Sequence, residues 1–191
     1  MTMRLFIALH LGSDIRERLS RMQAALRKAD AEGAIRWVNP DSMHLTLRFL
    51  GETPEFAVPG LISGLGASLA GQRAIRLGLA GIGGFPNLRQ PRVIWVGLVG
   101  DFEALHGLQQ RVETAVTVSG WPSESRPFQP HLTLGRAGDP KRPLAPNLSR
   151  AIASAKLDSE MQPHRNVALV RSHLGPRGSR YEDVADWSLE A

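Results

Sequence analysis

The chain contains the sequence HLTL twice, at residues 44–47 and again at residues 131–134. Leucine and threonine are good strand formers, and each copy follows a proline-containing approach, so both copies are predicted to lie in strands. One copy falls in each half of the chain. The repeat therefore predicts an α+β protein of two similar lobes, related by a pseudo-twofold axis, in which each lobe contributes one His-x-Thr strand.

Side chains two residues apart in a strand share a face. His44 and Thr46 are therefore expected to point one way, with leucines behind them in the core, and His131 and Thr133 should do the same. Two such strands meeting at the pseudo-twofold axis would place two imidazoles and two hydroxyls around a single cavity.

This set of groups suits phosphoryl transfer. The reaction needs a base that activates a nucleophile and an acid that protonates the leaving oxygen on the opposite side of the phosphorus. Histidine titrates near neutrality, so one ring can be neutral while the other is protonated. Threonine hydroxyls can donate to phosphate oxygens. A cyclic phosphate is strained and keeps its leaving oxygen tethered, so two histidines suffice without a metal.

The rest of the chain alternates strand and helix patterns. Apolar residues recur at helical spacing after Asp14, after Pro54, after Asp101 and around Leu148. The glycine- and proline-containing stretch 81–91 predicts a loop. Strands are expected at residues 4–9, 35–38, 44–50, 73–82, 92–98, 131–134, 166–174 and 181–189, the last two joined by a turn over residues 175–178.

The size and composition fit one folded domain. The chain has 191 residues, 42% of them hydrophobic, and no cysteine, which excludes thiol chemistry and Cys-ligated zinc. The net charge of +5 favours polyanionic partners, nucleic acid first among them. No apolar run approaches the roughly 20 residues that span a membrane. We expect a soluble, cytoplasmic protein that is a monomer and does not bind membranes.

Less specific interpretations exist for the same residues. A single His-x-Thr in a strand is common, and the duplicated strands can be purely structural. His44 and His131 can also be two ligands of a metal, but a catalytic zinc site usually takes a third, and the sequence has no HExxH motif. The other four histidines are isolated in the sequence. The segment 81–84 lacks the Lys-Ser/Thr of a phosphate-binding P-loop.

Longer motifs around both copies resemble a known family. Trp37-Val38-x-Pro40 followed by His44-Leu-Thr-Leu-Arg-Phe-Leu-Gly51 is similar to the first signature of the 2H phosphoesterase superfamily, and in particular of its RNA 2′,3′-cyclic phosphodiesterases, also called the 2′-5′ RNA ligase family. Arg126-Pro-Phe128-x-Pro130-His131-Leu-Thr-Leu-Gly-Arg136 resembles the second signature. The closing Ser172-x-Leu174-x-Pro176-x-Gly178-x-x-Tyr181 matches too, so the resemblance spans nearly the whole chain.

The resemblance implies a single bilobal domain over residues 1–191, with antiparallel sheets flanked by helices and the active site in the central groove. It implies that His44 is the proton donor and His131 the proton acceptor, that Thr46 and Thr133 hold the phosphate, and that Arg136 neutralises its charge. The implied substrates are RNA with 2′,3′-cyclic phosphate ends, or small cyclic nucleotides. The implied product is a 2′-phosphate, and no metal or other cofactor is implied.

Three further residues are candidates for substrate contacts. Strict alternation puts Arg48 on the face of His44, so we consider it a possible phosphate ligand or a solvated strand end. The same alternation puts Arg136 on the face opposite His131, unless Gly135 introduces a bulge. Phe128 is a candidate for stacking on an RNA base, whereas Phe49 is expected to pack in the core.

Two alternatives to hydrolysis remain open. The same chemistry run with a 5′-hydroxyl in place of water would make the protein a 2′-5′ RNA ligase. A non-catalytic module that binds nucleotides or RNA ends is the other alternative, although binding alone does not require a pair of titrating histidines.

Overall fold

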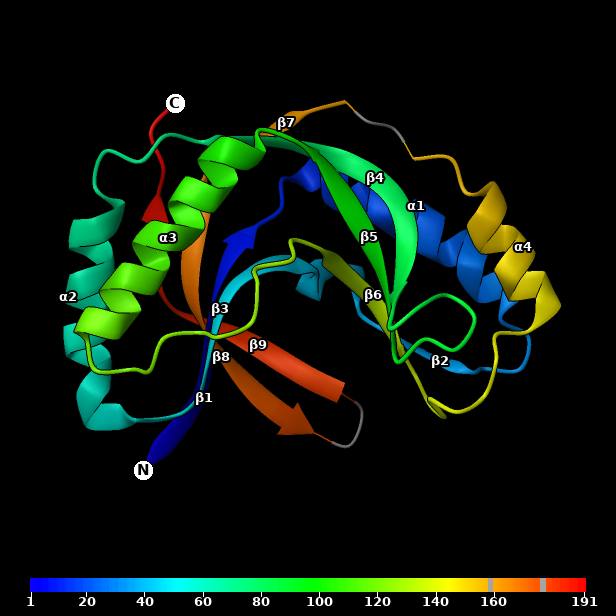
Figure 1. The fold of residues 1–191 in the computed structure, drawn as a ribbon, viewed down its shortest axis with the longest axis horizontal. Helices are drawn as coiled ribbons and strands as arrows, with labels where there is room; N and C mark the ends of the chain where they lie inside the picture. Colours follow the sequence, from blue (N-terminus) through cyan, green and yellow to red (C-terminus); the bar gives the residue numbers. More distant parts are fainter. Residues whose placement is uncertain (158–159, 176–177) are drawn as a thin grey trace.

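The computed structural model describes residues 1–157, 160–175 and 178–191, and the nine strands of this part of the chain are joined antiparallel into one sheet (Figure 1). The strands are β1 (Thr2–His10), β2 (Ile35–Trp37), β3 (His44–Pro54), β4 (Ile75–Phe85), β5 (Val93–Gly100), β6 (Leu132–Ala137), β7 (Gln162–His164), β8 (Asn166–Gly175) and β9 (Gly178–Ser188). The helices are α1 (Ser13–Ala29), α2 (Val58–Leu69), α3 (Phe102–Val118) and α4 (Pro146–Ser154), with 3-10 turns η1 (Pro40–Ser42) and η2 (Glu55–Ala57).

The sheet divides into two halves that meet at the repeated strands. Its order is β7-β4-β5-β6-β3-β1-β8-β9, with β2 added beside β6. The two copies of the repeat, in β3 and β6, are the neighbours at the middle of this order. The α+β bilobal fold predicted from the repeat is confirmed, because each half has a four-stranded run that ends on a His-x-Thr strand.

Two pairs of helices cover the flanks of the sheet. Figure 1 shows α2 beside α3 on one side of the molecule and α1 beside α4 on the other, and the members of each pair contact one another. The leucines of the repeated strands, Leu45, Leu47, Leu132 and Leu134, are all buried in one continuous apolar core with residues of these helices. This packing fixes which face of β3 and β6 carries the histidines.

The strand β4 is longer than the sequence predicts. It continues to Phe85 through the glycines that we expected to form a loop, and Gly83 pairs with Trp95 of β5. A Cβ atom at Gly83 would lie 2.2 Å from the Trp95 ring, so the glycine allows that ring to lie directly on the β4 backbone. The prediction of a loop was wrong for residues 81–85, where the glycines serve close packing within a strand, and is met for residues 86–91.

Several other expectations are met. The helix predicted around Leu148 is α4, and Asp101 caps α3 by accepting a 2.9 Å hydrogen bond from the Ala104 amide. Gly175 pairs with Gly178 where β8 turns into β9, while Pro176 and Arg177 of the predicted turn lie outside the described residues. No helix in the described part of the chain is both long enough and apolar enough to cross a membrane.

Candidate active site

The two repeated strands touch at a single point. Across the described residues, the ladder between β3 and β6 consists of the antiparallel pair Leu45 and Leu132. Because the strands run in opposite directions, this register sets residue 44 opposite residue 133 and residue 46 opposite residue 131. Each histidine therefore lies across from the threonine of the other copy, on the face away from the leucine core.

Both histidines are held by the same backbone contact. The Nδ1 atom of His44 lies 2.8 Å from the Ser42 carbonyl oxygen, and the Nδ1 atom of His131 lies 2.7 Å from the Gln129 carbonyl oxygen. A carbonyl oxygen can only accept, so each Nδ1 carries a hydrogen and donates it. This contact fixes both rings and leaves Nε2 of each as the atom available for proton transfer.

Aromatic rings surround each imidazole. Phe6 stacks on His44 at 4.6 Å between ring centroids, and Tyr181 meets it edge-on at 5.2 Å. On the other side, His131 meets the ring of Phe85 edge-on at 5.0 Å, with Trp95 at 6.4 Å. The rings come from β1 and β9 in one case and from β4 and β5 in the other, so each lobe supports its own histidine.

The free protein holds His44 in the neutral form. Burial beneath Phe6 and Tyr181 lowers the pKa of His44 from 6.5 to about 4, because a cation is poorly solvated there. The hydrogen bond to the Ser42 carbonyl and the nearby Asp183 carboxylate act in the opposite direction, and His10 adds to the lowering. At neutral pH His44 therefore carries its hydrogen on Nδ1 and a lone pair on Nε2.

A cavity of about 560 Å³ opens over this face of the sheet. Its lining includes His44 and Thr46 of the first copy, Thr133 of the second copy and Arg136 of β6, whereas His131 is not among the residues that line it. Its other lining residues include basic, aromatic and small polar side chains, namely Arg4, Phe6, Phe49, Arg126, Ser172, Ser179 and Tyr181, together with apolar ones, namely Leu5, Val38, Met43 and Leu174. The structure thus brings groups from far-apart segments to one basic, concave site.

A matching bulge lies directly after each His-x-Thr. The register of β3 against β1 skips Leu47, and the register of β6 against β5 skips Leu134. Each bulge reverses the alternation, so Phe49 and Arg136 reach the cavity face. Gly135 makes the second bulge possible, because a Cβ there would lie 2.5 Å from Ile35 of β2. Arg136 therefore lines the same cavity as Thr133.

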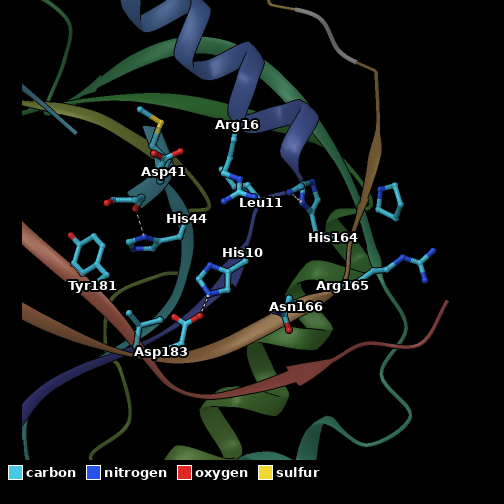
Figure 2. A pocket seen from close by; sticks show the side chains of 15 residues that line it. His10, Leu11, Arg16, Asp41, His44, His164, Arg165, Asn166, Tyr181 and Asp183 are labelled. Atoms are coloured by element: carbon cyan, nitrogen blue, oxygen red, sulfur yellow. Dashed lines mark hydrogen bonds and ion pairs between the residues drawn. The ribbon is translucent and has the colours of Figure 1, made fainter. Parts of the chain in front are cut away.

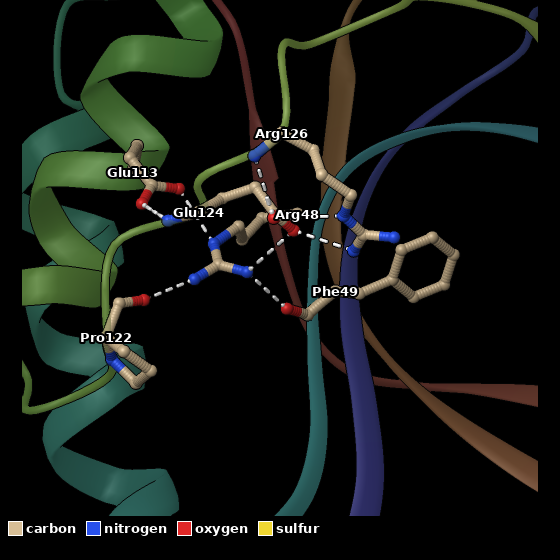
Figure 3. Close-up of polar contacts among 6 residues, drawn as sticks. All are labelled: Arg48, Phe49, Glu113, Pro122, Glu124 and Arg126. Carbon is tan, nitrogen blue, oxygen red and sulfur yellow. Dashed lines mark hydrogen bonds and ion pairs between the residues drawn. The ribbon is translucent and has the colours of Figure 1, made fainter.

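The bulge in β3 also removes Arg48 from the site. Its side chain is 8% exposed, and its Nε lies 2.7 Å from a Glu113 carboxylate oxygen of α3 (Figure 3). The guanidinium also donates to the backbone carbonyls of Phe49 and Pro122 and lies 3.5 Å from Glu124. The structure contradicts a phosphate contact for Arg48, because the extra residue in β3 turns its side chain away from the histidine and into the interface with α3.

The roles expected of the two phenylalanines are reversed. Phe128 packs onto the core and meets His106 of α3 edge-on, with 5.6 Å between centroids, so its ring is engaged away from the cavity. Phe49, expected in the core, is 56% exposed and lines the cavity, where its ring packs against Phe6. Phe49 therefore joins Phe6 and Tyr181 among the aromatic residues that line the cavity.

The sequence gave no site role to most of the residues that line the cavity, among them Tyr181, Phe6, Arg4 and Arg126. Tyr181 ends the motif that begins at Ser172, but nothing in that motif indicated a function for the tyrosine. Phe6 and Arg4 belong to the strand predicted over residues 4–9, for which the sequence indicated no contact with a ligand. Arg126 also reaches the cavity, held by Glu124 through hydrogen bonds of 3.1 and 2.9 Å. That contact lowers the pKa of Glu124 to about 2, chiefly because the Arg126 side chain hydrogen-bonds its carboxylate.

Within the described residues, no three His, Asp or Glu side chains group as a metal site.

Comparison with known proteins identifies related chains. The model of a family described as "LigT like Phosphoesterase" matches residues 9–95 and again residues 96–181. A Methanothermobacter thermautotrophicus protein named RNA 2′,3′-cyclic phosphodiesterase is 32% identical over 99% of this chain and all of its own. A protein of the same name from Thermus thermophilus is 36% identical, covering 98% of this chain and 90% of its own.

Solved structures show the same fold. A Thermus thermophilus structure superimposes with a TM-score of 0.81 at 31% identity and covers 98% of both chains. The structure of Escherichia coli LigT complexed with 3′-AMP gives a TM-score of 0.75 at 27% identity over 99% of both chains. The twofold match of the family model, one copy per half of the sequence, mirrors the repeat from which the bilobal fold was predicted.

Proposed function

The chain belongs to the family of LigT-like phosphoesterases, and we propose that it hydrolyses the 2′,3′-cyclic phosphate ends of RNA to 2′-phosphomonoesters. The observation that carries this proposal is the pair of histidines, each fixed by its Nδ1–H and each opposite the threonine of the other strand. The names of the relatives and the basic, aromatic cavity support an RNA end as the substrate.

The proposed mechanism assigns one proton transfer to each histidine. Nε2 of His131 takes a proton from water as the water oxygen bonds to phosphorus. The bond between phosphorus and the 3′ oxygen breaks, and Nε2 of His44 gives that oxygen a proton, so the phosphate stays on the 2′ oxygen. Thr46 and Thr133 donate hydrogen bonds to the non-bridging oxygens. The step uses no metal, because both proton transfers are made by side chains.

Substrate binding has to supply the proton on His44. With a pKa of about 4, the free ring is neutral at pH 7. The negative charge of a bound phosphodiester favours an imidazolium beside it, which raises the pKa of His44 in the complex. The acid is therefore formed together with the substrate complex.

Hydrolysis of adenosine 2′,3′-cyclic phosphate by the purified protein tests the proposal. We expect adenosine 2′-phosphate as the product, at the same rate with and without EDTA, as measured by chromatography. Loss of activity with EDTA would indicate a metal-dependent hydrolase. Tight binding without turnover would indicate a binding module, and a 2′-5′ linked product with an RNA bearing a 5′-hydroxyl would indicate a ligase.

Replacement of Arg136 by glutamine tests its role as the phosphate ligand. Charge-assisted hydrogen bonds contribute about 1.5–3 kcal/mol, so kcat/KM should fall by roughly 10- to 150-fold. The matched control is Arg150→Gln on α4, where the arginine hydrogen-bonds Asn147. Equal kinetics for the two variants would rule out Arg136 as a substrate contact.

A further inference from the structure

A second cavity lies on the other side of His44. It has a volume of about 650 Å³ and shares Ser42, Met43, His44 and Tyr181 with the first. Figure 2 shows His44 between Tyr181 and His10, with Asp183 next to His10. The wall of this cavity therefore places ionisable side chains beside the proposed proton donor, on the side away from Thr46.

The strand register places His10 beside His44. The two residues are direct partners in the β1–β3 ladder, so their side chains leave the sheet on the same face. The Nε2 atom of His10 lies 2.9 Å from a carboxylate oxygen of Asp183, which comes from β9. Asp183 follows Tyr181 by two residues without an irregularity between them, so this face of β9 presents both side chains to His44.

Other charged groups face His44 from the elements around it. On the side of the second cavity these are Asp41 of η1, Arg16 of α1, His164 of β7 and Arg165. On the side of the first cavity they are Arg4 of β1, Arg126 and Arg136. Among these groups, His10 is the direct strand partner of His44, and Asp183 is the group that binds His10.

We propose that His10 and Asp183 are a positioning pair that sets how readily His44 is protonated. The proposal rests on the proposed function, since it concerns the residue assigned as the proton donor. His10 disfavours a positive charge on the neighbouring His44 ring, whereas the Asp183 carboxylate favours one. Held together by their hydrogen bond, the two offset each other, so His44 gains its proton from the substrate complex and not from its neighbours.

Two isosteric variants separate this role from a structural one. His10→Gln keeps a donor toward Asp183 but cannot carry a proton, so the carboxylate is left unbalanced and the pKa of His44 should rise. Asp183→Asn keeps an acceptor for His10 but removes the anion, so the pKa of His44 should fall. Both groups are partly exposed, at 33% and 45%, so shifts of about half a unit to one unit are expected.

The matched control is Glu182→Gln on the same strand. Glu182 binds His173 at 2.7 Å through an equally exposed histidine–carboxylate contact, but His173 and Glu182 lie outside both cavities. This variant should leave His44 and the pH dependence of kcat unchanged.

Titration of the His44 ring by NMR and the pH dependence of kcat together test the pair. The expected result is an upward shift in both for His10→Gln, a downward shift in both for Asp183→Asn, and no shift for Glu182→Gln. Shifts in the same direction for the two variants, or none in either, would overturn the inference. The NMR titration does not require catalytic turnover. If the wild-type protein proves inactive, the proposed function is refuted, but the effect of His10 and Asp183 on the titration of His44 can still be measured.

Discussion

Replacement of His131 by alanine is expected to lower kcat/KM for 2′,3′-cyclic phosphate hydrolysis by about 10²- to 10⁴-fold. The variant loses the group that accepts the proton of water, while Thr133, Arg136 and the cavity remain. Because the ring of His131 contacts aromatic side chains at the edge of the site and not the leucine core, the fold should tolerate the change. Initial rates with a nucleoside 2′,3′-cyclic phosphate, together with a thermal melt, provide the measurement.

Two further variants make this result specific. His44→Ala should cause a loss of similar size, and the double variant should be little worse than either single one, because the two rings act on one phosphorus atom. His173→Ala removes a histidine that binds Glu182 outside the cavities and should retain wild-type activity. Substantial activity in His131→Ala would remove this residue from the mechanism.

Replacement of Arg48 by methionine is expected to destabilise the fold by about 3 kcal/mol, because the change leaves Glu113 partly buried without its cation. For a chain of this size, that corresponds to a fall in Tm of roughly 6–12 °C. Urea or thermal denaturation measures the change. The kcat/KM of the folded variant at 25 °C should remain near that of wild type, since Arg48 faces α3 and not the cavity.

A second substitution controls for the cause. Adding Glu113→Gln to Arg48→Met removes the stranded charge and should restore part of the lost stability, while Glu124 keeps its contact with Arg126. The contradicting result would be an Arg48→Met variant that has the same midpoint of urea denaturation as wild type but binds substrate more weakly. In that case Arg48 is a substrate ligand, and its assignment to the α3 interface is wrong.

Strand periodicity was enough to predict which side chains of the two repeated strands face away from the leucine core. A two-residue spacing puts His44 with Thr46 and His131 with Thr133, and the buried leucines between them confirm the face. The repeat also predicted that two lobes would meet at these strands. The first inference depends only on regular alternation, which holds from each histidine as far as its threonine, and the second depends only on the duplication of the tetrapeptide.

Beyond each threonine, regular alternation fails. The bulges at Leu47 and Leu134 are set by how β1 and β5 pack alongside, and no local pattern in the sequence marks the first of them. Arg48 and Phe49 were therefore each assigned to the wrong face. The second bulge had a visible signal in Gly135, whose missing side chain makes room for β2.

The position of Phe128 depended on contacts that are distant in sequence. The proline-rich segment around Phe128 has no regular spacing of apolar residues from which the direction of the ring could be predicted. The ring packs against His106 of α3, the helix that comes before this segment in the chain. His10 was likewise isolated in the sequence. Only the pairing of β1 with β3 and the return of β9 bring His10 next to His44 and Asp183.

The matched bulges give equivalent positions to unlike side chains, a phenyl ring at residue 49 and a guanidinium at residue 136. A duplicated backbone would by itself treat the two ends of a ligand alike. Because one lobe presents a flat phenyl ring and the other a guanidinium cation at the same position, the two sides of the pseudo-symmetric cavity differ chemically. An asymmetric molecule such as a nucleotide would then contact two chemically different side chains at equivalent positions of the two lobes.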